Sequence, residues 1–268
     1  MRALRRAAIA ALLLVAAAAE RPAAARDGVA AVPYPGPARS IGSAANGCLA
    51  GAEALPLSGP GWETLRPERN RFWGNPALVA FLEDMAGKTR PLGRLLIADM
   101  AQPRGGHMVS GHGSHQTGLD VDILYTLSDH PLTKEERSLP AMDSILAADG
   151  TLSAWTVKQT TLVRTFAENA LVERIFVNPA IKRMLCQTVR GDRTWLTRIR
   201  PWWGHADHFH VRLSCPSGDH ECRPGPPIPA GDGCGAELDW WFTPEAAQPR
   251  PASGPPPVMP AACKAILQ

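Results

Sequence analysis

Two short segments, residues 110–122 and 202–210, contain five of the eight histidines of the chain. The first segment also contains two aspartates, Asp120 and Asp122. A zinc ion in a hydrolase takes two or three imidazole ligands and a carboxylate, and keeps one position open for water. These segments supply all of those donors. The sequence therefore predicts a metal site, and a fold that brings two distant regions of the chain together.

The N-terminal residues 1–25 have the pattern of a secretory signal peptide. Basic residues precede an unbroken apolar run, Ala7–Ala19, and three small residues follow before Arg26. The apolar run is shorter than the ~20 residues that a membrane-spanning helix needs. We therefore expect a protein exported to the periplasm, with no stable membrane insertion after the signal is cleaved.

Most of the apparent basicity belongs to this targeting segment. Removal of residues 1–25 takes away four arginines and one glutamate, which leaves 24 basic and 24 acidic residues in place of 28 and 25. A chain without net charge offers no electrostatic argument for binding nucleic acid. A neutral substrate, or one of mixed charge, fits this composition better.

All six cysteines lie in the part of the chain expected to be exported, where an oxidising compartment favours disulfides. No Cys-x-x-Cys pair occurs, so a cysteine zinc site is disfavoured. Six cysteines allow 15 pairings. The sequence alone favours only the nearest pair, Cys215 with Cys222.

Hydrophobic patterns predict a mixture of helices and strands. Within the strand expected over residues 119–124, Asp120 and Asp122 share one face. His208 directly precedes the strand expected over residues 209–213 and shares a face with His210. We expect helices over residues 75–85 and 155–170, and strands over residues 94–98, 119–124, 174–177 and 209–213.

The expected architecture is α+β, with a single domain over residues 44–268. A small antiparallel sheet should carry the zinc site, flanked by helices and by disulfide-tied loops. Residues 26–43 are rich in Pro, Gly and Ala and should form an extended lead. Residues 244–260 contain seven prolines in 17 positions and predict an extended strap, which a disulfide from Cys263 would tie back to the domain.

Three motifs resemble the penicillin-insensitive murein endopeptidases, within the group of lysostaphin-like and D-Ala-D-Ala-cleaving metallopeptidases. The group pattern is a His, six residues and an Asp, followed later by His-x-His. Here it corresponds to the spacing from His115 to Asp122 and to the run 208–210. The narrower family is marked by the runs 111–122, 177–182 and 231–235, which read GHGSHQTGLDVD, VNPAIK and GDGCG.

The resemblance implies one zinc ion held by His115, Asp122 and His210, with His208 and His205 as catalytic residues. Two neutral imidazoles and one carboxylate leave a zinc site with net charge +1, which lowers the pKa of a bound water toward ~7. A metal-bound hydroxide is therefore the expected nucleophile. Which of His205 and His208 acts as the base stays open.

A second zinc site is a further possibility, with His112 and Asp149 as ligands. The family pattern places another histidine three residues after that aspartate, whereas this chain has Leu152, so the second site would lack a ligand. Asp120 is expected to orient a ligand histidine rather than to bind the metal.

The resemblance also implies hydrolysis of the D-alanyl to meso-diaminopimelyl cross-link of peptidoglycan, without inhibition by penicillin. Two other functions remain open: a carboxypeptidase or dipeptidase that cleaves D-Ala-D-Ala, and a wall-binding module in which a metal only stabilises the fold. For the disulfides, the resemblance implies Cys48 with Cys263, Cys186 with Cys234, and Cys215 with Cys222.

Overall fold

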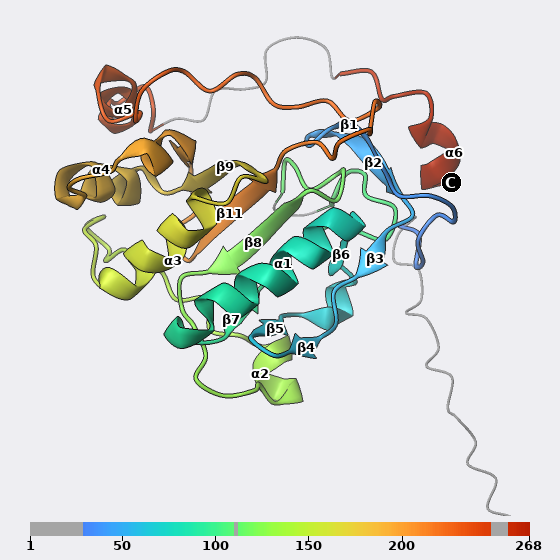
Figure 1. Cartoon of the computed structure of the whole chain (residues 1–268), viewed down its shortest axis with the longest axis horizontal. Coiled ribbons are helices and arrows are strands. Elements are labelled where there is room, and N and C mark those ends of the chain that lie inside the picture. The colour runs from blue at the N-terminus through green and yellow to red at the C-terminus, as the bar shows by residue number, and fades with distance from the viewer. Residues whose placement is uncertain (1–28, 110–111, 248–256) are drawn as a thin grey trace, which may run out of the picture.

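A sheet of seven strands runs through the centre of the protein in the computed structural model, which describes residues 29–109, 112–247 and 257–268 (Figure 1). The predicted signal peptide, the first residues of the lead and residues 248–256 of the predicted strap lie outside the described residues. The order of the strands is β10 (Ile199–Pro201), β9 (Val172–Val177), β11 (His208–Leu213), β8 (Asp120–Leu124), β7 (Leu95–Ile97), β5 (Trp62–Thr64) and β4 (Ser58–Gly59).

The expectation of a small antiparallel sheet is correct for the centre and wrong for the whole. Strands β9, β11, β8 and β7 pair antiparallel, whereas β10 pairs parallel with β9, and β5 pairs parallel with β7. The additional strands are only two or three residues long. Segments this short contain too few residues to show a hydrophobic period, so these strands could not be predicted.

The two predicted helices are confirmed, and each begins at a side-chain cap. The Asn75 side chain accepts a hydrogen bond of 3.0 Å from the backbone N–H of Ala77, and Pro76 opens α1 (Pro76–Thr89). Thr156 and Gln159 form a capping box at the start of α3 (Val157–Ala167). A third helix, α4 (Pro179–Thr188), follows a second Asn-Pro pair and was not predicted.

Smaller elements surround the sheet. Strand β1 (Arg39–Ser43), from the segment expected to be extended, pairs with β2 (Asn46–Ala50) in a hairpin. The remaining elements are β3 (Glu53–Ala54), β6 (Trp73–Gly74), α2 (Lys134–Ser138), α5 (Ala236–Asp239), α6 (Cys263–Leu267), and short 3-10 helices at Pro67–Arg69, Arg90–Leu92, Thr194–Arg198 and Trp240–Phe242. Among the described residues, no helix has the length and hydropathy that crossing a membrane requires.

The two faces of the central strands differ in character. Buried apolar side chains from β8 and β11 pack with α1 and α3 in the main core: Val121, Ile123, Phe209 and Val211 from the strands, and Leu78, Leu82, Met85, Leu162 and Phe166 from the helices. Because side chains alternate along a strand, the opposite face of β8 and β11 carries the polar residues. The core therefore fixes which way the candidate site residues point.

The three disulfides implied by the resemblance are confirmed: Cys48–Cys263, Cys186–Cys234 and Cys215–Cys222. The first joins β2 to α6, which lie side by side in Figure 1, across a sequence separation of 215 residues. A cross-link that closes so long a loop restricts the unfolded chain strongly.

Replacing both Cys48 and Cys263 by alanine should lower the free energy of unfolding by about 5 kcal/mol, because the open chain regains its loop entropy. Urea denaturation of the two proteins measures this difference. The matched control is the double replacement of Cys215 and Cys222, which are separated by only 7 residues. By the same loop-entropy relation, that change should lower the free energy of unfolding by about 2 kcal/mol. Equal losses in the two variants would contradict an origin in loop length.

Candidate metal centre

The pairing of β8 with β11 assembles the polar face. In this antiparallel register His210 lies opposite Asp122, and Arg212 lies opposite Asp120. Residues directly opposite each other on antiparallel strands project to the same side, with Cβ atoms about 4.5–5.5 Å apart. The two carboxylates therefore meet their partners through backbone pairing alone.

The carboxylate of Asp122 lies at the centre of four imidazoles. Its Oδ1 is 3.1 Å from His210 Nδ1, 3.4 Å from His115 Nε2 and 3.7 Å from His208 Nε2. Its Oδ2 is 3.4 Å from His112 Nδ1. Three of the histidines expected at the first zinc site, His115, His208 and His210, thus lie around Asp122. His112, expected at a second site, lies beside the same carboxylate.

The donor atoms at this position fit a metal ion. His115 is fully buried, and neither of its ring nitrogens has a hydrogen-bond partner in the described part of the chain. Oδ1 of Asp122 is also buried there without a hydrogen bond. Buried polar atoms left unpaired cost about 1–3 kcal/mol each, more when charged. A cation bound by imidazole nitrogen and carboxylate oxygen would satisfy these atoms.

Three other carboxylates each contact a site histidine at the ring nitrogen that does not face Asp122. His210 Nε2 lies 2.7 Å from Asp120 Oδ1, and His208 Nδ1 lies 2.7 Å from Asp207 Oδ1. Asp120 thus lies where an orienting residue is expected, whereas Asp207 was missed, although it directly precedes His208 in the sequence.

The third pair is Asp99 with His112, whose Nε2 lies 2.9 Å from Asp99 Oδ2. Asp99 was also missed, and the signal for it was its position just after the predicted strand 94–98. A carboxylate only accepts hydrogen bonds, so in each pair the imidazole nitrogen facing the carboxylate carries the proton. In a neutral ring, the nitrogen that faces Asp122 then keeps its lone pair for a metal or a proton.

The protonation of these rings depends on their surroundings. Burial acts to lower the pKa of His210, but its contacts with Asp120 and Asp122 outweigh burial and raise that pKa to about 9. Burial lowers the pKa of His205 to about 4, so this ring is neutral at pH 7. Binding of a metal by His210 would therefore release a proton.

Backbone strain is present at two of the predicted site residues. His115 and His205 have φ angles of 66° and 54°, in the left-handed region that residues other than glycine seldom adopt. The loop that contains His115 is held by its neighbour Gln116. The side chain of Gln116 accepts from the backbone N–H of Gly47 at 3.2 Å and donates to the backbone oxygen of Ala45 at 2.9 Å.

A group of possible ligands found in the described residues differs in part from the expected set. Ligand atoms of His112, His115 and Asp122 all lie within 4.8 Å of one another. The expected set contains His210 in place of His112, so the two sets share His115 and Asp122. Two histidines compete for the third position, and the ligand set stays a prediction.

The predicted second site receives no added support from geometry. Asp149 is exposed, and its Oδ1 accepts hydrogen bonds of 2.9 and 2.6 Å from the backbone and hydroxyl of Thr151. In the described residues no hydrogen bond or ion pair joins it to His112, which instead contacts Asp99 and Asp122. A second metal at His112 and Asp149 stays a prediction.

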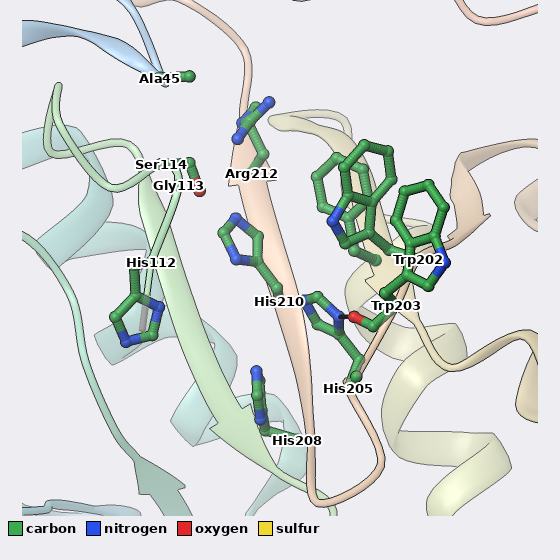
Figure 2. A pocket seen from close by; sticks show the side chains of 12 residues that line it. Ala45, His112, Gly113, Ser114, Trp202, Trp203, His205, His208, His210 and Arg212 are labelled. Carbon is green, nitrogen blue, oxygen red and sulfur yellow. Dashed lines mark hydrogen bonds between the residues drawn. The ribbon is translucent and has the colours of Figure 1, made fainter. Parts of the chain in front are cut away.

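The site opens into a cleft of about 430 Å³, a size typical of ligand pockets (Figure 2). Figure 2 shows His112 on one side, His208 and His210 along β11, and Trp202 and Trp203 on the other side. His205 Nδ1 lies 2.6 Å from the backbone oxygen of Trp203, which ties this histidine to the aromatic wall.

Comparison with known proteins decides the family. The sequence model described as "Penicillin-insensitive murein endopeptidase" matches residues 40–268. The chain belongs to the penicillin-insensitive murein endopeptidase family. A protein of that name from Klebsiella pneumoniae subsp. pneumoniae is 45% identical over 245 residues, covering 88% of each chain. One from Yersinia enterocolitica is 42% identical over 240 residues, covering 88% of this chain and 87% of its own. The family resemblance found in the sequence is confirmed.

The third ligand can be identified by zinc content. Asp122→Ala and His115→Ala should each lose most bound zinc, since both residues belong to either set. If His210 is the third ligand, His210→Ala should lose zinc while His112→Ala retains it, and the reverse result assigns His112. Elemental analysis after dialysis measures the ratio of zinc to protein.

A matched control is His130→Ala, which removes an exposed histidine that also pairs with an aspartate, Asp129, at 2.7 Å. This variant should keep its zinc. Full zinc content in Asp122→Ala would show that the wrong carboxylate was chosen, with Asp120 as the next candidate.

Proposed function

We propose that this protein is a periplasmic zinc endopeptidase that hydrolyses D-alanyl–meso-diaminopimelyl cross-links of peptidoglycan and is not inhibited by penicillin. The observation that carries the proposal is the buried carboxylate of Asp122 among four imidazoles, with the ring nitrogens of His115 unpaired. The names of the relatives support murein as the substrate and endopeptidase as the activity.

The donor set of imidazoles and a carboxylate is one that zinc prefers. When bound, zinc supplies a Lewis acid that polarises the amide carbonyl and lowers the pKa of a water molecule. The protein residues then have to bind the peptide, orient it and move protons between water and the leaving amine.

His208 is the residue best placed to move a proton. It lines the cleft, its Nδ1 is held by Asp207 at 2.7 Å, and its Nε2 faces Asp122. With Nδ1 protonated toward Asp207, Nε2 of the neutral ring accepts a proton from the attacking water and returns it to the leaving amine.

His205 has a different hydrogen-bond role. A backbone carbonyl only accepts, so Nδ1 of the neutral His205 ring donates to Trp203 and its Nε2 has the lone pair. Its ring centroid lies 5.0 Å from that of His208. We assign proton transfer to His208. His205, whose ring lies beside it, is assigned the role of a hydrogen-bond acceptor through Nε2.

Insensitivity to penicillin follows from the absence of a serine nucleophile in this mechanism. Ser114 lines the cleft, but none of the hydrogen bonds among the described residues joins its hydroxyl to a histidine. A serine without an adjacent base is a weak nucleophile. A β-lactam, which traps an activated serine, then has no target at this site.

His208→Ala should retain zinc and lose at least ~100-fold in kcat, the usual scale for removal of a general acid or base. Asp207→Asn should cause a smaller loss, since it weakens the orientation of His208 without removing the ring. Initial rates on a cross-linked muropeptide and zinc content are measured together, with His130→Ala as the control. Loss of zinc from His208→Ala would make His208 a ligand instead.

The reaction itself is tested on purified murein sacculi. The zinc-loaded protein should convert cross-linked dimers into monomers, separated by liquid chromatography. A chelator should abolish this conversion, added zinc should restore it, and penicillin should leave it unchanged. Shortening of pentapeptides without loss of dimers would favour a carboxypeptidase. Binding to sacculi with no new products would favour a wall-binding module.

A further inference from the structure

Arg212 continues the row of side chains that line the cleft from β11. It follows His208 and His210 at intervals of two residues, so all three project from the same face of the strand. In Figure 2 Arg212 lies at the end of the cleft opposite His208, between the Gly113–Ser114 loop and the tryptophan wall. Neither the proposed metal site nor the proposed proton transfer uses its guanidinium.

The guanidinium of Arg212 is held by the protein at Nε, whereas its terminal nitrogens are not held. Its Nε donates to Asp120 Oδ1 at 2.6 Å, and its Cζ lies 5.3 Å from the centroid of the Phe176 ring. Its two terminal nitrogens make no hydrogen bond within the described residues, and neither is a buried unpaired atom. The side chain thus lines the cleft and keeps two terminal NH2 groups available to a ligand.

The charge of the cleft favours an anionic ligand at this position. Among the described residues that line it, Arg212 is the only lysine or arginine, and none is acidic. Asp120 is fully buried behind it and is already shared with His210 Nε2 at 2.7 Å. The planar fork of a guanidinium matches a carboxylate in a bidentate arrangement.

We propose that Arg212 determines specificity by binding a substrate carboxylate attached to the carbon next to the scissile amide nitrogen. The inference rests on the proposed function and adds to it the group that is recognised. In a D-alanyl–meso-diaminopimelyl cross-link, the carbon bearing the amide nitrogen also bears a carboxylate. Arg212 and His210 share one oxygen of Asp120, so a carboxylate held by Arg212 lies beside the candidate metal ligands.

A terminal D-Ala-D-Ala has a carboxylate in the same relation to its amide, so the chemistry recognised is common to both substrates. Synthetic peptides separate the two sources. One pair contains D-alanine joined to one amine of meso-diaminopimelate, with either a carboxylate or a carboxamide on the adjacent carbon. A second pair contains D-Ala-D-Ala with a free or amidated terminus.

Arg212→Gln should lower kcat/KM for the carboxylate form of the cross-link peptide on the order of 10- to 100-fold, mainly through KM. For the carboxamide form the same variant should change kcat/KM by less than about threefold. Arg212→Lys, which keeps the charge without the fork, should lie between wild type and Arg212→Gln. Arg223→Gln, at an exposed arginine on the neighbouring surface, should resemble wild type.

Other outcomes would overturn the inference. Equal losses on both forms of the peptide, together with a loss of zinc, would mean that Arg212 acts through Asp120 and His210 alone. No loss on either form would remove Arg212 from substrate binding. Discrimination confined to the D-Ala-D-Ala pair would assign the recognised carboxylate to a peptide terminus and overturn its assignment to the cross-link.

A binding experiment separates this inference from the proposed function. Calorimetry measures the affinity of the zinc-loaded protein for meso-diaminopimelate and for its diamide, neither of which contains the scissile bond. If wild type cleaves no peptide but Arg212→Gln selectively weakens binding of the carboxylate form, the assignment of Arg212 stands and the proposed reaction fails. If cleavage occurs and binding of neither compound depends on Arg212, the reaction stands and the assignment fails.

Discussion

The register between β8 and β11 is the constraint on which the site depends. It places His210 against Asp122 and Arg212 against Asp120, while Phe209 and Val211 enter the core. A slip of one residue would exchange these faces, because the side-chain period of a strand is two. The apolar core therefore specifies which face of β8 and β11 becomes the polar site, since a one-residue slip would bury charge against α1 and α3.

Burial of acidic groups is the second demand that the arrangement meets. Asp99, Asp120 and Asp122 are each at most 3% exposed. A buried carboxylate is stable as an anion only when charged or hydrogen-bonding partners surround it. Imidazoles supply that environment for Asp122, and arginines add to it at Asp99 and Asp120. The network that orients the histidines is also the one that makes burial of the acids tolerable.

Local signals in the sequence were sufficient for the parts of the fold that depend on neighbouring residues. The hydrophobic patterns over residues 75–85 and 119–124 each predicted an element type from residues close together in the sequence, and both elements are present. The approach of Asp99 to His112 depends instead on how β7 lies beside β8, which no short pattern encodes.

The same distinction applies to the site. The spacing from His115 to Asp122 identified two residues common to both possible ligand sets, because one loop and one strand position them. The choice between His112 and His210 depends on ring orientations, which Asp99 and Asp120 set from elsewhere in the fold. Short strands such as β4 and β10 owe their existence to pairing partners and not to their own residues.

The support of the His115 loop has a consequence for the order in which the protein matures. Gln116 is anchored to the β1–β2 hairpin, and that hairpin is covalently tied through Cys48 to Cys263, 215 residues further along the chain. A growing chain can form the strands around Asp122 well before it contains Cys263. The hairpin beneath His115 gains its covalent tie only after that residue has been synthesised and the thiols have been oxidised. The covalent support of the His115 loop is thereby acquired late, and only where redox conditions favour the oxidation of thiols.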